Sequence, residues 1–166
     1  MSSMMLKRIP TLDDNELLRL YKNCWAEIEK NSPRTDDARK IILRIHEVWE
    51  QRMKSASIGQ YKATTPDEGI LKALDYKVGN QGEPPHVRRK ILTFIMMQRL
   101  PFVGSPAYMM EWGEPQSTKR YNKLRSVLHN LYLKSMNMEH FEKASREWVE
   151  DRDWLIQQWN ISQFKS

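Results

Sequence analysis

Residues 105–133, SPAYMMEWGEPQSTKRYNKLRSVLHNLYL, contain the clearest helix signals in the chain. Ser105 before Pro106 predicts a helix start, because serine caps free N–H groups and proline is tolerated at the first helical position. Gly113 predicts the end of this short helix, since glycine adopts the left-handed conformation of a helix C-terminus without strain. Ser117 is placed to cap the next helix. The stretch therefore predicts a short helix, a tight turn and a long helix.

The predicted long helix is amphipathic, and its first turns are basic. Its apolar side is formed by Tyr121, Leu124, Leu128 and Leu131. We expect Arg120 on the exposed side, sharing an edge with Lys119 and Lys123. Cations oppose the helix macrodipole at this end, at a cost of about a few tenths of a kcal/mol each, so folding alone does not favour them. A helix, a turn and a basic helix form the arrangement that places a helix in a DNA groove.

Two helices that form a hairpin are predicted in the N-terminal part of the chain. Apolar residues recur at helical spacing over residues 12–30, with Thr11 as the cap. The short break at residues 31–35 predicts that the following helix packs back antiparallel against the first. Further on, Thr65-Pro66-Asp67-Glu68 spells a capping box, which predicts a short helix through Leu74.

The remaining patterns are also helical. Helices are predicted after Pro84-Pro85 and from about Asn137, while residues 76–82 favour a short extended or β element. The chain is therefore expected to be all-α, a multi-helix bundle with a helix-turn-helix-like unit and at most one short β element. We expect an N-terminal helical hairpin over residues 1–62 and a helical domain over residues 63–166 that contains the basic segment.

The charge favours an acidic partner. The chain has 27 Lys and Arg against 21 Asp and Glu, a net charge of +6, and a pI of about 9.4. Residues 63–135 contain eleven basic and six acidic side chains, whereas residues 136–166 contain four and six. The basic excess thus peaks around the helix-turn-helix candidate, which indicates nucleic acid or an acidic protein surface as the partner.

Cys24 is the single cysteine, so the chain has neither an intrachain disulfide nor a thiolate zinc site. It lies between Tyr21 and Trp25 in an apolar helical pattern, which predicts a buried structural thiol. No apolar run approaches the roughly 18 residues that span a bilayer, and the N-terminus lacks the core of a signal peptide. We expect a cytoplasmic protein without a membrane contact.

Signals for catalysis or metal binding are weak. No two histidines lie three or four positions apart, the spacing that places two ligands on one helix face; they are His46, His86, His129 and His140. Asp67 and Asp75-x-Lys77 match the two-acid-plus-lysine pattern of metal-dependent nucleases, but the capping box already explains Asp67. An acidic cluster near the C-terminus suits either a cation or neighbouring basic side chains: Glu147, Glu150, Asp151 and Asp153. No metal and no cofactor is expected.

Several short runs are distinctive in the second half of the chain. The most specific is Trp112-Gly113-x-Pro115-x-Ser117-x-x-Arg120, and the others are LDYKVG at residues 74–79, RRKIL at 88–92 and DWL at 153–155. With these runs, nearly the whole chain resembles a family of all-helical bacterial and phage proteins for which no activity is established. The resemblance implies an all-helical fold and a prokaryotic or phage setting, and it implies nothing about chemistry.

Together these patterns predict a non-enzymatic nucleic-acid-binding module, with DNA as the first choice. The predicted contacts to backbone or base edges are Ser117, Lys119, Arg120 and Lys123, and the predicted phosphate contacts are Arg88, Arg89 and Lys90. One alternative is a protein-interaction module or inhibitor from a phage or mobile element, which exposure of Met109 or Met110 would favour. Another is a metal-dependent nuclease.

Overall fold

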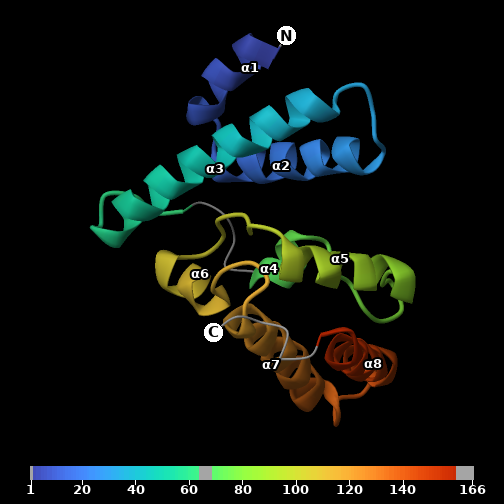
Figure 1. The fold of residues 1–166 in the computed structure, drawn as a ribbon. Helices are drawn as coiled ribbons and strands as arrows, with labels where there is room; N and C mark the ends of the chain where they lie inside the picture. The colour runs from blue at the N-terminus through green and yellow to red at the C-terminus, as the bar shows by residue number, and fades with distance from the viewer. Residues whose placement is uncertain (1, 64–68, 160–166) are drawn as a thin grey trace. The chain divides into compact units, whose positions relative to one another are not determined.

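The computed structural model describes residues 2–63 and 69–159, and these residues form helices without a strand (Figure 1). The all-α prediction is therefore confirmed. The segment around residues 76–82, for which a short β element was allowed, forms turns: the Gly82 N–H donates to the Gly79 carbonyl at 3.0 Å, and the Glu83 N–H donates to the Lys77 carbonyl at 3.0 Å. Across the described ranges, no helix has the length and hydropathy needed to cross a membrane.

The chain divides into two compact units, each made of two stretches of sequence. The first unit contains the chain up to Ala73 together with Pro101–Met109, and the second contains Leu74–Leu100 together with the chain from Met110 onward. A sequence boundary between residues 62 and 63 stays a prediction.

The first unit is built on a helix hairpin. Helices α2 (Asp14–Glu29) and α3 (Thr35–Ser57) lie side by side and run antiparallel (Figure 1), which confirms the predicted hairpin. Helix α1 (Ser2–Arg8) and the 3-10 turn η1 (Ile9–Thr11) pack against α3. The short helix α4 (Gly69–Ala73) also belongs to this unit.

Helix α2 is capped by Asp13 and not by Thr11. The Asp13 carboxylate accepts the Glu16 N–H at 2.8 Å, and the Glu16 carboxylate accepts the Asp13 N–H at 2.9 Å. This reciprocal pair is a capping box, and it satisfies two N–H groups that the helix itself leaves unbonded. The capping box predicted at Thr65 and Glu68 lies outside the described residues.

Aromatic and aliphatic side chains fill the space between α2 and α3. The rings of Tyr21 and Trp49 meet edge to face with their centroids 5.1 Å apart. Cys24 of α2 is also buried, and burial raises the pKa of its thiol to about 11. A thiol that resists ionisation is unreactive, which agrees with the predicted structural role.

The second unit contains helices α5 (Pro85–Met97), α7 (Thr118–Ser135) and α8 (Glu142–Gln158). Helix α7 packs along α8, and α5 contacts both (Figure 1). Helix α6 (Pro106–Trp112) ends in this unit. The last helix begins at Glu142, several residues later than predicted. The core is apolar and includes Leu92, Ile95, Met96, Trp112, Leu124, Leu128 and Leu155.

Candidate nucleic-acid interface

The turn over residues 113–117 joins α6 to α7, as the sequence predicts. Gly113 has a φ of +62°, in the left-handed region, and a Cβ at this position would lie 2.9 Å from the Cβ of Lys119. Glycine is therefore required both for backbone conformation and for space. The Gln116 N–H donates to the Met96 carbonyl at 2.8 Å, which ties the turn to the last turn of α5.

Ser117 is the N-cap of α7. Its Oγ accepts the Arg120 N–H at 3.1 Å and donates to the Glu114 carbonyl at 2.7 Å. The hydroxyl thus satisfies one of the free N–H groups of the helix and closes the turn at the same time. The cap is confirmed, and it occupies the hydroxyl that was also predicted to contact nucleic acid.

Arg120 is buried, so the prediction that it lies on the exposed side of its helix was wrong. The residue is 2% exposed, and its guanidinium donates to the carbonyls of Ile95 and Gln98 at the end of α5 and of Trp112 and Gly113 at the end of α6. Carbonyls at helix C-termini lack intrahelical partners and are partially negative, which suits a cation. The apolar spacing of α7 did not reveal that the end of α5 covers this flank of the helix.

Arg88 is also buried, contrary to its predicted role as a phosphate contact. It is 0% exposed and pairs with two carboxylates of α8: its Nε lies 2.7 Å from Asp151 Oδ2, and its Nη1 bonds to Glu147. The Tyr76 hydroxyl donates to the same Asp151 oxygen at 2.5 Å. Two members of the predicted acidic cluster thus hold a buried arginine of α5.

The buried cluster has perturbed protonation equilibria. Burial and the Asp151 carboxylate raise the pKa of the Tyr76 hydroxyl. Burial alone would lower the pKa of Arg88, but the hydrogen bonds and the negative charge of Asp151 outweigh it and raise the pKa. The Glu147 carboxylate also accepts the Gly79 N–H at 2.8 Å. These bonds join α5, α8 and the turn at residues 76–82 and point to a structural cluster.

The neighbours of Arg88 on α5 are more accessible. Arg89 is half-buried, with its guanidinium carbon 5.7 Å from the centre of the Trp154 ring. Lys90 is exposed. Both remain on the surface of the second unit, although the stacking on Trp154 already orders Arg89.

The two predicted lysines of α7 differ in their surroundings. Lys119 is exposed and forms no ion pair among the described residues. The Nζ of Lys123 lies 2.8 Å from Glu111 Oε2 and 5.8 Å from the centre of the Trp112 ring. Lys123 therefore ties the end of α6 to α7.

The solvent side of α7 presents residues that the sequence reasoning missed. Asn122, Ser126 and Asn130 are all exposed, and their spacing of four residues places them in one row along the helix. Lys119 stands near one end of α7 and Lys134, also exposed, near the other. The signal was available in the sequence, because the eighteen residues of α7 include five Lys and Arg and no acid.

Helices α6 and α7 follow one another as a helix-turn-helix unit would, but the main packing partner of α7 is α8. The solvent side of α7 is therefore oriented by the α7–α8 pair, together with the bonds of Arg120. Met110 in α6 is 70% exposed, whereas Met109 is half-buried.

Within residues 2–63 and 69–159, no three His, Cys, Asp or Glu side chains gather in a way that would hold a metal ion. Asp67 of the nuclease-like pattern lies outside these ranges.

No family model matches the chain, and comparison with curated proteins and with solved structures finds nothing significantly similar to it.

Proposed function

We propose that the protein binds nucleic acid, without catalysing a reaction, through the solvent side of α7. The observation that supports this most is the composition of α7: five Lys and Arg, one His and no Asp or Glu in eighteen residues. The fold accounts for Arg120 and Lys123 but not for the rest of this composition, because an acid in the first turn of a helix would be stabilising and α7 has none there. A helix without acids and with one solvent-exposed side suits a partner with dense negative charge.

The row on α7 offers two kinds of contact. Lys119 and Lys134 are placed to neutralise phosphates. The amides of Asn122 and Asn130 and the hydroxyl of Ser126 have both donors and acceptors, which suits the edges of bases. The major groove of B-DNA admits an α-helix, whereas the deep groove of duplex RNA does not. Duplex DNA is therefore the preferred ligand. In this proposal Arg88 and Arg120 hold the fold, and Lys90 and Arg89 are peripheral.

A protein partner is the second candidate, because apolar side chains are exposed in the same unit. Besides Met110, the end of α7 and the following turn expose four large apolar side chains: Leu133, Met136, Met138 and Phe141. Flexible methionines are common at binding surfaces for proteins. This candidate predicts binding that is independent of nucleic acid and less sensitive to salt.

Fluorescence anisotropy with labelled duplex DNA, single-stranded DNA and duplex RNA at two salt concentrations tests the proposal. We expect the tightest binding to duplex DNA. The logarithm of the association constant should fall by about 0.9 per phosphate contact for each tenfold rise in salt concentration. Lys119→Ala with Lys134→Ala should reduce that slope by about 1.8. Asn122→Ala with Asn130→Ala should weaken binding while leaving the slope nearly unchanged.

The matched control removes the same charge from α8. Lys143→Ala with Arg146→Ala changes two exposed cations that form no ion pair in the described chain. An equal loss of affinity in this control would mean that net charge, and not the α7 surface, determines binding. Absence of binding at low salt would overturn the proposal and favour the protein partner.

A further inference from the structure

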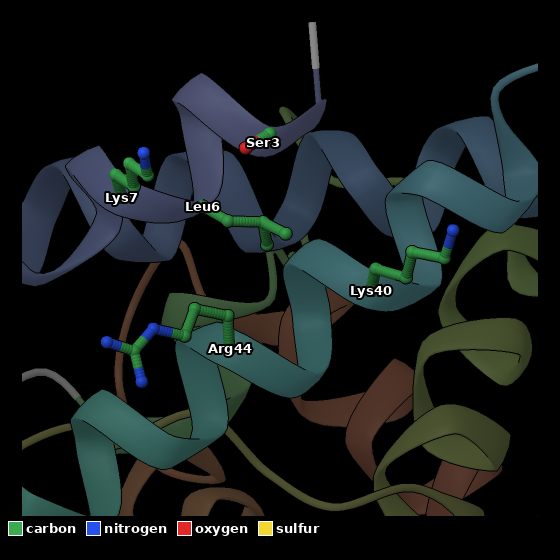
Figure 2. A pocket seen from close by; sticks show the side chains of 5 residues that line it. All are labelled: Ser3, Leu6, Lys7, Lys40 and Arg44. Atoms are coloured by element: carbon green, nitrogen blue, oxygen red, sulfur yellow. The ribbon is translucent and has the colours of Figure 1, made fainter.

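Helices α1 and α3 enclose a shallow pocket in the first unit. Figure 2 shows its five lining side chains, of which Ser3, Leu6 and Lys7 come from α1 and Lys40 and Arg44 from α3. Three of the five are cations, one is a hydroxyl and none is an acid. The pocket is therefore a concentrated positive surface outside the basic segment that the sequence singled out.

Ion pairing inside the first unit accounts for only one of these cations. The Arg44 guanidinium lies 2.7 Å from Glu47 Oε2 on the next turn of α3. Lys7 and Lys40 are both exposed, and neither pairs with a carboxylate in the described part of the chain. Like charges on facing helices repel, so packing of α1 on α3 does not require them.

The directions of the side chains bear on the kind of anion. In Figure 2 the charged ends of Lys7 and Arg44 lie toward one side of the pocket, and the amine of Lys40 lies toward the other. The three groups do not converge on one point, as they would around a single phosphate. Charges spread along a surface suit an anion with repeated phosphates.

We infer that this pocket, defined by Lys7, Lys40 and Arg44, is a second contact for the phosphate backbone of the nucleic acid. The inference rests on the proposed function of α7 and extends it to the other unit. Contacts from lysine and arginine ends to phosphates raise affinity without reading sequence.

The test compares three double variants of the full chain on the same duplex DNA, with salt slopes measured for each. Lys7→Ala with Lys40→Ala should lower the affinity several-fold and reduce the salt slope by about 1.8, or 0.9 for each lost phosphate contact. The matched control, Arg19→Ala with Lys62→Ala, removes two exposed cations of the same unit that form no ion pair in the described ranges, and it should leave both quantities unchanged. The α7 variant Lys119→Ala with Lys134→Ala is measured in parallel.

The outcomes separate this inference from the proposed function. An unchanged slope in the pocket variant, together with a loss in the α7 variant, would overturn the inference and leave the proposed function intact. A loss in the pocket variant alone would support the pocket and overturn the α7 surface. Vesicles of phosphatidylcholine and phosphatidylserine form the last arm: binding to them that requires Lys7 and Lys40, with no binding to DNA, would assign the pocket to lipid headgroups and overturn both.

Discussion

The Arg120 guanidinium donates hydrogen bonds to the C-terminal ends of two helices, α5 and α6. Its four acceptors are backbone carbonyls at or just after the C-terminal ends of α5 and α6, at distances of 2.5–2.9 Å. Arginine suits this position because its planar group presents five donors in a fixed geometry, whereas lysine presents a compact charge on a flexible stem. Arg120 therefore stabilises the fold, and its guanidinium donors are used by these carbonyls and not offered to a ligand.

Replacing Arg120 should therefore destabilise the protein. Arg120→Ala leaves buried carbonyls without donors, and we expect a loss of about 3 kcal/mol or more in the free energy of unfolding. Arg120→Lys should recover only part of the loss. Urea unfolding measures the effect, with the exposed neighbour variant Lys119→Ala, expected to change stability by less than about 0.5 kcal/mol, as the control. Equal stabilities of the Arg120→Ala and Lys119→Ala variants would show that the buried bonds contribute nothing.

At the scale of elements, the motif Trp112-Gly113-x-Pro115-x-Ser117-x-x-Arg120 describes the joint between α5, α6 and α7. Trp112 is 1% exposed, Gly113 makes the left-handed turn, Ser117 caps α7 and Arg120 binds the ends of the two preceding helices. These four residues of the motif therefore have structural roles.

The cap at Ser117 can be separated from ligand binding by substitution. Ser117→Ala removes the side-chain acceptor for the Arg120 N–H and should destabilise the protein by about 0.5–2 kcal/mol. Ser117→Asn retains a capping oxygen and should restore most of the stability. Thermal melts and DNA affinity are measured on both variants. If Ser117→Asn restores stability but not affinity, the hydroxyl contacts the nucleic acid directly, and the purely structural role is wrong.

At the scale of the whole molecule, each unit has its own buried polar groups in addition to an apolar core. In the first unit, Asp14 accepts hydrogen bonds from Arg52 and Tyr61. In the second, Asp151 accepts from Arg88 and Tyr76. The two tyrosines and Cys24 all have a raised pKa, and burial is the largest cause of the rise in each.

These raised pKa values predict alkaline destabilisation. The pKa of Cys24 rises from 9.0 to about 11 and that of Tyr61 from 10.0 to about 12, while Tyr76 is also raised above 10.0. Above pH 9 the unfolded chain begins to lose protons that the folded chain keeps, so the free energy of unfolding falls as pH rises. The stabilisation is fully present below pH 9.

Denaturant unfolding from pH 8 to 10 measures this dependence. Cys24→Ala should flatten the first part of the decline, between about pH 9 and 10, because the variant lacks the thiol that ionises first in the unfolded chain. A variant that declines as steeply as the parent chain would show that the Cys24 thiol ionises equally easily in the folded and unfolded states.

The sequence by itself determined the helical class, the α2–α3 hairpin and the helix–turn–helix order, because these depend on local signals. Apolar periodicity, Gly113 and Ser117 act through bonds and contacts within a few residues of themselves. The sequence also contained the acid-free composition of α7, on which the proposed interface rests.

Only the tertiary structure decided which cations are available to a ligand. Arg88 and Arg120 look like surface residues from composition, yet each has a partner far along the chain: Asp151 lies 63 positions from Arg88, and Ile95 lies 25 positions from Arg120. Lys7 and Lys40 remain exposed, and they line one pocket only because α1 packs against α3. The reason is physical: a helical period shows which side of a helix is apolar, but the carbonyls and carboxylates that bury a charged group are brought near it by chain folding alone.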